Sequence, residues 1–174
     1  MTVMSQTLRA SILATIASGI MAFAPQASAE GRSDWQGYAW QKFDITKCLP
    51  DASGALVCPA YHQKWDWKRN QWVDIAITIK GDRLHLVQQL TDNDSYDQDY
   101  VCVTALVLDG AGRDLIAHHQ NWQIAAGQQL ADTFEYSSSA LGQAASIHIG
   151  SKQCRDGAGQ DDATYAAVLA GIGN

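Results

Sequence analysis

The sequence predicts an all-β fold, a single antiparallel two-sheet β-sandwich with a short helix near the carboxyl end. Apolar and polar residues alternate at period 2 along most segments after Tyr38, and turn sequences rich in Gly, Asp and Asn separate these segments at short intervals. Short alternating strands with frequent turns are typical of a sandwich. A closed β-barrel produces the same pattern and is the alternative.

The first predicted strand covers residues 38–45, with Tyr38 and Trp40 on one face. A hairpin follows, in which residues 61–67 and 72–79 flank the polar turn Lys68-Arg69-Asn70-Gln71. In the second arm the branched apolar side chains all fall on one face, as expected of a strand with one buried side. These side chains are Val73, Ile75, Ile77 and Ile79.

Gly81-Asp82 is predicted to turn the chain into a strand at 83–90, with Leu84 and Leu86 on the inner face. An acidic loop occupies 91–99. Residues 100–108 are then apolar at nearly every position, which is typical of a central strand covered on both faces.

The remaining chain is predicted to form a turn at 109–113, a strand at 114–124 and shorter strands at 134–137 and 146–149. A helix is expected at 161–170. Two aspartates at its amino end favour the helix dipole, and Gly171 can cap the other end.

Residues 1–29 have the pattern of a cleavable secretory signal peptide. Arg9 is their only charged side chain, an apolar run covers 10–23, and Ala27-Ser28-Ala29 fits cleavage by a signal peptidase. The apolar run is too short to span a bilayer. We therefore expect residues 30–174 to form one soluble domain, periplasmic or secreted, with no membrane span.

Loss of residues 1–29 removes Arg9 and no acidic residue, so the formal net charge changes from −6 to −7. An acidic surface of this kind disfavours nucleic acids and anionic membranes as partners, because both are bound through Lys and Arg.

All four cysteines, Cys48, Cys58, Cys102 and Cys154, follow the predicted signal, and an even number in an oxidising compartment predicts two disulfides. Three pairings are possible. The turn residues between Cys48 and Cys58 bring these two close, so the preferred pairs are Cys48 with Cys58 and Cys102 with Cys154. No two cysteines have the spacing of a zinc or redox motif.

One local pattern, Cys58, then Trp72, then Tyr100-Val101-Cys102, resembles the Cys, Trp, Tyr-x-Cys order of immunoglobulin domains. The resemblance implies an immunoglobulin-like topology with a bridge from Cys58 to Cys102. It covers about 45 residues, and further strands follow Cys102 where the family has nearly reached its last strand. The pattern therefore favours a sandwich and decides nothing about function.

An aromatic cluster surrounds the predicted turn at 68–71 and comprises Tyr61, His62, Trp65, Trp67 and Trp72. Flat rings beside polar groups can stack on sugars or anchor a protein partner. In the alternative interpretation, Trp67 and Trp72 form a cross-strand pair that stabilises the hairpin, and Trp65 lies in the core.

The acidic loop offers a possible calcium site formed by Asp92, Asp94, Asp97 and Asp99. Carboxylate oxygens at this spacing can bind Ca²⁺, although the glycine and distal glutamate of an EF-hand loop are missing. The alternative is a solvated connecting loop.

No motif for nucleophilic, zinc-dependent, phosphate-binding or dinucleotide-binding chemistry occurs in the sequence. The adjacent His118 and His119 would point to opposite faces of a strand and so could not bind one metal together. His85 and His148 are expected on the polar sides of their strands.

We therefore expect an exported, non-enzymatic binding or accessory protein without a cofactor, which recognises an envelope protein or polysaccharide through the aromatic hairpin or a sheet edge. One alternative is an envelope-acting hydrolase with a site assembled from His62, Asp66 and their neighbours. Another is a Ca²⁺-responsive accessory domain that uses the acidic loop.

Overall fold

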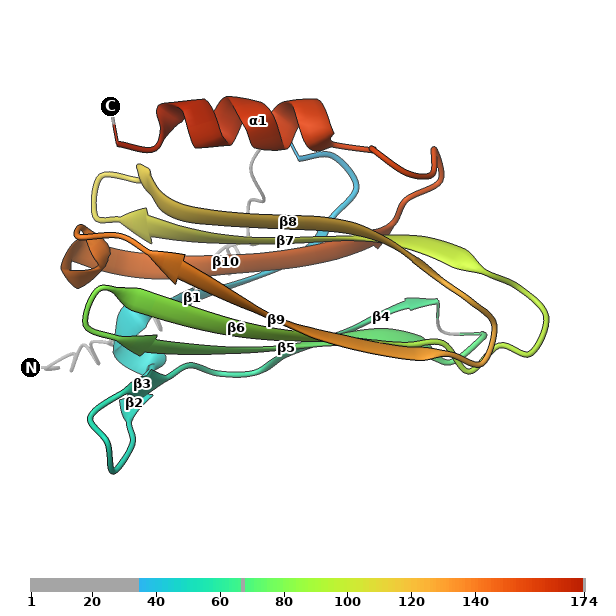
Figure 1. Ribbon diagram of the computed structural model, residues 1–174, viewed down its shortest axis with the longest axis horizontal. Coiled ribbons are helices and arrows are strands. Elements are labelled where there is room, and N and C mark those ends of the chain that lie inside the picture. Colours follow the sequence, from blue (N-terminus) through green and yellow to red (C-terminus); the bar gives the residue numbers. More distant parts are fainter. Residues whose placement is uncertain (1–34, 67, 174) are drawn as a thin grey trace, which may run out of the picture.

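The structure, a computed structural model, describes residues 35–66 and 68–173. Two antiparallel sheets pack face to face, and one helix lies on the outer face of the first sheet (Figure 1). The first sheet has the strand order β1-β10-β7-β8. Its strands are β1 (Ala39–Asp44), β10 (Ala144–Gln153), β7 (Asp99–Asp109) and β8 (Asp114–Ile124).

The second sheet has the order β2-β3-β5-β6-β9, and β4 also pairs with β5. Its strands are β2 (Leu49–Pro50), β3 (Leu56–Val57), β4 (Tyr61–Asp66), β5 (Gln71–Lys80), β6 (Arg83–Thr91) and β9 (Gln129–Ser137). The predicted sandwich is confirmed, because among the described residues the sheets stay separate and form no closed barrel.

Three helical segments complete the described chain: the 3₁₀ turns η1 (Ile45–Lys47) and η2 (Leu141–Gln143), and the helix α1 (Asp162–Gly171). Within the described ranges, no helix is long and apolar enough to cross a membrane. The predicted signal peptide at 1–29 lies outside the described residues.

The core lies between the sheets and consists of side chains at alternating strand positions. In β5, for example, Val73, Ile75 and Ile77 are almost fully buried, while Asp74 and Ala76 lie on the outer face. Burial on one side only is what the period-2 pattern predicts.

Strand β7 is buried on both faces, as its continuous apolar sequence predicts. Its inner side chains, such as Val101 and Val103, belong to the core between the sheets. Its outer side chains Leu106 and Leu108 pack with Val168 of α1 in a second cluster. The helix therefore supplies the second cover that this strand requires.

Three local expectations are wrong. Strands β9 and β10 extend well beyond 134–137 and 146–149, because polar residues there also join the backbone ladders. Gly171 is the last residue of α1, and the extended Ile172 follows it as the C-cap. His148 is buried rather than on a polar surface, since Lys42 of β1 and Leu106 of β7 lie directly opposite it on the same face of the sheet and flank its side chain.

Two disulfides join Cys48 to Cys58 and Cys102 to Cys154, which confirms the preferred pairing. The Cys58–Cys102 bridge implied by the immunoglobulin resemblance is wrong. Cys102 alternates with the core residues Val101 and Val103 of β7, so its side chain lies on the outer face of the first sheet. It therefore points away from the second sheet, where Cys58 follows β3.

Candidate functional site

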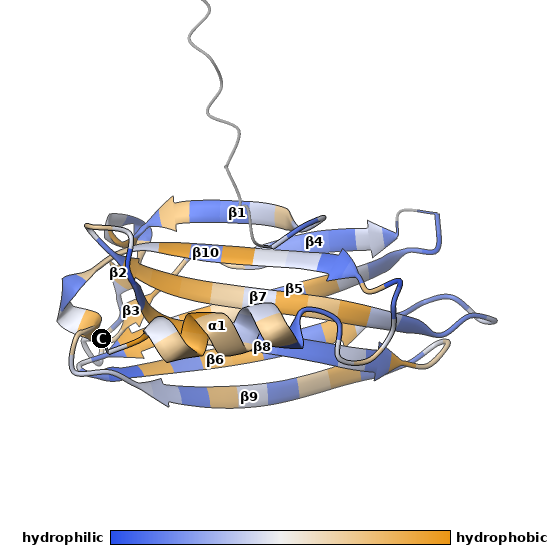
Figure 2. Cartoon of the chain, turned by 90° about the horizontal axis from the view of Figure 1, so that it is seen from above, coloured by the Kyte–Doolittle hydropathy of each residue, from blue (hydrophilic) through white to orange (hydrophobic). Residues whose placement is uncertain are grey.

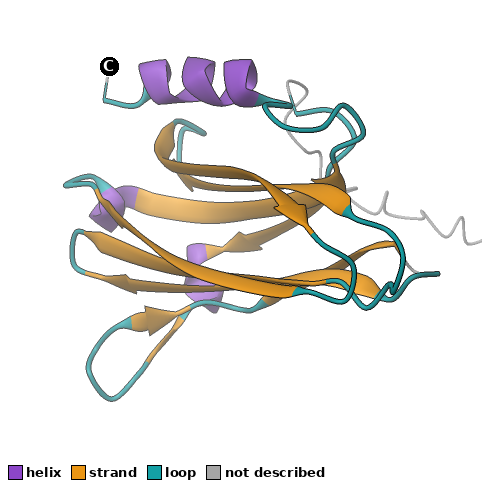
Figure 3. Ribbon diagram, turned by 45° about the vertical axis from the view of Figure 1, so that its right-hand side comes forward, coloured by secondary structure: helices purple, strands orange, loops and turns teal. Residues whose placement is uncertain are grey.

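A cleft of about 590 Å³ lies at one edge of the sandwich, where β1 and β4 border the gap between the two sheets. Strand β4 contributes Gln63, Lys64 and Trp65 to it. Strand β10 and the loop before α1 contribute most of the opposite wall, which comprises Ser151, Lys152, Gln153, Arg155, Asp156 and Gln160. Figure 3 shows this loop at the same end of the molecule as the β6–β7 loop.

Trp65 is the aromatic wall of the cleft, and its orientation is set by a buried carboxylate. The indole Nε1–H donates to Asp99 Oδ2 at 3.2 Å, and Gln153 Nε2–H donates to the other carboxylate oxygen of Asp99. Asp99 is 5 % exposed. A ring fixed by a buried hydrogen bond loses little conformational freedom when a ligand stacks on it.

The polar lining is rich in amides and carries more basic than acidic side chains. Four glutamines, Gln36, Gln63, Gln153 and Gln160, line the cleft and offer both donors and acceptors. Lys64, Lys152 and Arg155 outnumber the single carboxylate of Asp156. Because Lys152 is paired with Asp161 and the Lys64 ammonium donates to Asn70 of the hairpin turn, amide groups rather than net charge dominate the lining.

Lys152 is fixed in place by three neighbours. Its Nζ lies 2.6 Å from Asp161 Oδ2, donates to the backbone oxygen of Gln36 at 2.8 Å, and sits 4.5 Å from the centre of the Tyr38 ring. Burial raises the pKa of Tyr38, whose hydroxyl remains protonated and donates to Asp161 Oδ2 at 3.0 Å. This network joins the segment before β1, strand β10 and the residue before α1.

Tyr61 was a predicted surface residue of the aromatic cluster, but it belongs to the core and is 2 % exposed. Its hydroxyl donates to the backbone oxygen of Ala39 at 2.9 Å and lies 2.8 Å from Ser151 Oγ. Burial raises its pKa to about 12. Odd positions of β4 face inward, so Tyr61 holds the two sheets together instead of meeting a ligand.

His62 and Trp72 lie on the opposite, solvent-exposed face of the second sheet. His62 Nδ1 is 2.6 Å from Asp74 Oδ1, and the Trp72 indole donates to Asp74 Oδ2 at 2.9 Å. The structure thus separates them from Trp65. Trp67 lies outside the described residues, so the proposed Trp67–Trp72 pair stays a prediction.

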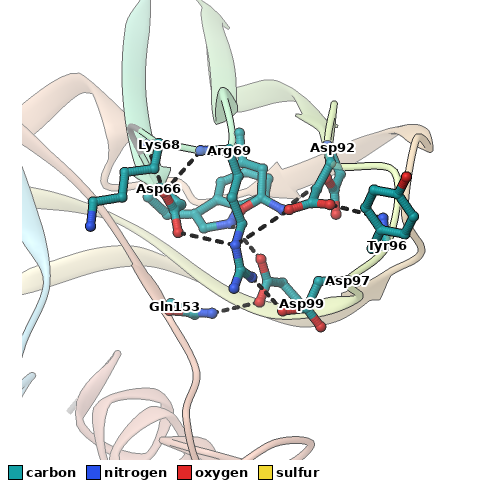
Figure 4. Close-up of polar contacts among 11 residues, drawn as sticks. Asp66, Lys68, Arg69, Asp92, Tyr96, Asp97, Asp99 and Gln153 are labelled. Atoms are coloured by element: carbon teal, nitrogen blue, oxygen red, sulfur yellow. Dashed lines mark hydrogen bonds and ion pairs between the residues drawn. The ribbon is translucent and has the colours of Figure 1, made fainter.

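Three carboxylates of the hairpin and the acidic loop surround a guanidinium group (Figure 4). Arg69 forms ion pairs with Asp66, Asp94 and Asp97. Arg69 therefore pairs with two of the four aspartates of the predicted calcium site, Asp94 and Asp97. The contacts hold the β4–β5 turn against the β6–β7 loop.

The other two predicted calcium ligands point to different partners. Asp92 is buried and accepts from Gln71 Nε2 at 2.8 Å, and Asp99 accepts from Trp65. Within the described part of the chain, no three His, Cys, Asp or Glu side chains are grouped to hold a metal ion. The four loop aspartates are thus not brought to one point.

The residues named for a hydrolase site are also separated by their contacts. Asp66 Oδ1 accepts the backbone N–H groups of Lys68 and Arg69 and so stabilises the hairpin turn. His62 pairs with Asp74 instead. Among the described residues that line the cleft, neither His62 nor Asp66 occurs.

Sequence reasoning missed most of the cleft. Trp65 was identified from its aromatic neighbours, but Gln153, Arg155 and Gln160 come from a segment with no motif. A run of amides and charges near the carboxyl end is the only signal, and it does not indicate which strand the segment faces.

No protein-family model and no curated protein matches the sequence. Among solved structures, the chain is similar to a DUF1425 family member from Shewanella sp. pv-4, with 9% identity and a TM-score of 0.36 over 62% of this chain and 95% of that one. It is also similar to the Avr2 effector protein from the fungal plant pathogen Fusarium oxysporum, with 8% identity and a TM-score of 0.33 over 72% and 95% of the two chains. Likenesses at this level show no function. The chain is a disulfide-containing β-sandwich with a polar cleft at one edge.

Proposed function

We propose that this chain is an exported, non-enzymatic binding module that recognises a partner of the cell envelope through the cleft at the β1–β4 edge. Of the two partner classes expected from the sequence, a polysaccharide fits the cleft better than a protein. The observation that carries this proposal is a fixed tryptophan ring in a cleft lined mainly by amide side chains.

The chemistry of the lining supports a carbohydrate ligand. A sugar ring has an apolar C–H face that stacks on an indole, and hydroxyl groups around its rim that need both donors and acceptors. Glutamine amides provide both. The volume of about 590 Å³ is within the range of small-molecule sites and is sufficient for a short stretch of a chain.

Export is part of the proposal and rests on residues 1–29 together with the two disulfides. Disulfides persist mainly in oxidising compartments. In a bacterial host, we expect mass spectrometry of the protein to show an amino terminus at Glu30 and four oxidised cysteines in the periplasmic or medium fraction. A full-length protein with free thiols in the cytoplasm would contradict export.

Polysaccharide binding is testable with an array of purified bacterial envelope polysaccharides, followed by calorimetric titration of any that bind. We expect binding by the wild-type protein and about tenfold weaker binding after Trp65→Phe or Gln63→Ala. Phenylalanine offers a smaller ring without the hydrogen bond to Asp99 that orients Trp65, and alanine at position 63 lacks the amide that would bond the ligand. Trp72→Ala is the matched control, since this aromatic side chain lies on the other face of the hairpin.

Two results would contradict the proposed site. One is an array without any bound polysaccharide. The other is an equal loss of affinity in Trp72→Ala and Trp65→Phe, which would move the contact to the outer face of the sheet. Near-ultraviolet circular dichroism of each variant separates loss of binding from loss of folding.

A further inference from the structure

Strand β9 forms an open edge of the second sheet and suggests a binding surface separate from the cleft. All nine of its residues pair with β6 without a register shift. No described segment pairs with its other side, and Figure 2 shows β9 along the margin of the molecule. Edge strands in natural proteins are usually short or interrupted by proline, lysine or a bulge, and β9 has none of these protections.

The backbone groups that face the open edge can be identified from neighbouring contacts. The Thr133 N–H is bound by the side chain of Asp132, at 2.7 Å, and therefore does not point to β6. At both ends of β9, the even-numbered Gln128 and Ser138 bond toward the β6 side. Because antiparallel ladders alternate, Ala131 and Glu135 present their N–H and C=O groups to the open edge, whereas Thr133 presents its C=O and its N–H is already bound by Asp132.

A small pocket lies directly beside this edge. It has a volume of about 270 Å³ and is lined by Trp122, Gln123, Leu130, Ala131 and Asp132. Trp122 comes from β8, the edge strand of the other sheet, and its ring lies 6.1 Å from that of Phe134. The pocket thus combines an aromatic wall, an aliphatic wall and a carboxylate.

Asp132 is an unusual residue for its position. It alternates with Leu130 and Phe134, which pack against the core, so it is a charged side chain on the inner side of an edge strand. Among the described residues, no Lys, Arg or His forms an ion pair with it. An inward charge of this kind opposes pairing with an ordinary apolar strand.

We propose that the β9 edge binds an extended peptide segment of another protein by strand addition, with one Lys or Arg side chain of that segment in the Trp122–Asp132 pocket. Backbone hydrogen bonds would supply affinity and the pocket would supply specificity. The long alkyl stem of a basic side chain fits against Trp122 and Leu130, and its cationic head reaches Asp132. A second copy of this chain is a poorer occupant, because β9 contains no basic residue.

The test uses a blocked heptapeptide of alternating threonine and valine with a central arginine, and a second peptide in which uncharged citrulline replaces arginine. Fluorescence anisotropy should show the arginine peptide binding at least about tenfold more tightly to the wild-type protein. Asp132→Asn should remove this difference. Glu135→Gln is the matched control, because it changes an acidic residue of β9 whose side chain lies on the outer face, and the difference should persist.

Ala131→Pro removes one outward N–H without interrupting the β6–β9 ladder, so it should weaken both peptides. The strand-addition proposal fails if neither peptide binds at millimolar concentration, or if Ala131→Pro has no effect in a protein whose circular dichroism is unchanged. Equal binding of the two peptides by the wild-type protein would overturn the role of Asp132. Concentration-dependent dimerisation that Ala131→Pro abolishes would make a second copy the occupant and also overturn the proposal.

Discussion

Replacement of Cys102 and Cys154 together by alanine is expected to lower the free energy of unfolding by about 4 kcal/mol. This bridge joins residues 52 positions apart, and on the chain-entropy model a crosslink stabilises more as the loop it closes becomes longer. Both cysteines are also buried, at 0% and 3% exposure, so their removal loses packing as well. Urea unfolding monitored by tryptophan fluorescence measures the difference.

The matched control for this experiment is the double replacement of Cys48 and Cys58. That bridge closes a loop of only 10 positions, which predicts a loss of about 3 kcal/mol. If the Cys48/Cys58 variant were the less stable of the two, loop length would not be the dominant contribution. Each variant retains one intact disulfide and no free thiol, so disulfides cannot reshuffle while the protein unfolds.

The second large effect is a loss of stability when the pH falls from about 6.5 toward 3, caused by His118 in β8. This side chain lies between the sheets and is 1% exposed. Its Nε2 lies 3.0 Å from Gln88 Oε1, an oxygen that can only accept a hydrogen bond. Nε2 therefore carries the proton of the neutral ring. The Tyr136 hydroxyl then donates to Nδ1 at 2.7 Å.

Burial, with a smaller contribution from the adjacent His119, lowers the pKa of His118 to about 3. The unfolded chain takes up a proton at this residue near its ordinary pKa of about 6.5, whereas the folded protein does not. The stabilisation is therefore complete above pH 6.5 and is lost as the pH decreases, by up to about 1.4 kcal/mol per pH unit. Burial also lowers the pKa of His119, which adds in the same direction.

Urea unfolding at pH 7 and pH 4.5 tests this prediction in the wild type, His118→Gln and His85→Gln. His118→Gln should be less stable at pH 7, because it disturbs the bonds to Gln88 and Tyr136, but should lose less stability on acidification. The exposed His85 serves as control and should leave the pH dependence unchanged. An identical pH dependence in wild type and His118→Gln would show that this histidine does not contribute.

The local sequence pattern predicted the strands well where the burial of each side chain follows from the geometry of its own strand. The alternation in β5 and the continuous apolar run of β7 each follow from the backbone geometry of a strand, which places successive side chains on opposite faces. The same rule places His118 and His119 on opposite faces, and both are found there in separate hydrogen-bond networks. The pairing of Cys48 with Cys58 was predictable because the turn between them is local.

The site was less predictable, because it depends on which distant segments lie side by side. The five residues of the aromatic cluster are neighbours in the sequence, yet the pleat of β4 sends Tyr61 into the core and His62 to the outer surface. The charge of Asp94 or Asp97 is visible in the sequence, whereas its neutralisation by Arg69 follows from the contact between two loops.

The sequence by itself therefore determined the sandwich class, the alternating core and the Cys48–Cys58 pairing, since each depends on short-range periodicity or on turn chemistry, and the Cys102–Cys154 pairing followed because only these two cysteines were left. Only the tertiary structure decided that Trp65 of β4 faces a wall of amides from β10 and the loop before α1, and that Asp132 of β9 faces Trp122 of β8. Both arrangements lie where the two sheets meet at an edge. Strand order and sheet packing, rather than any local pattern, determine which side chains meet there.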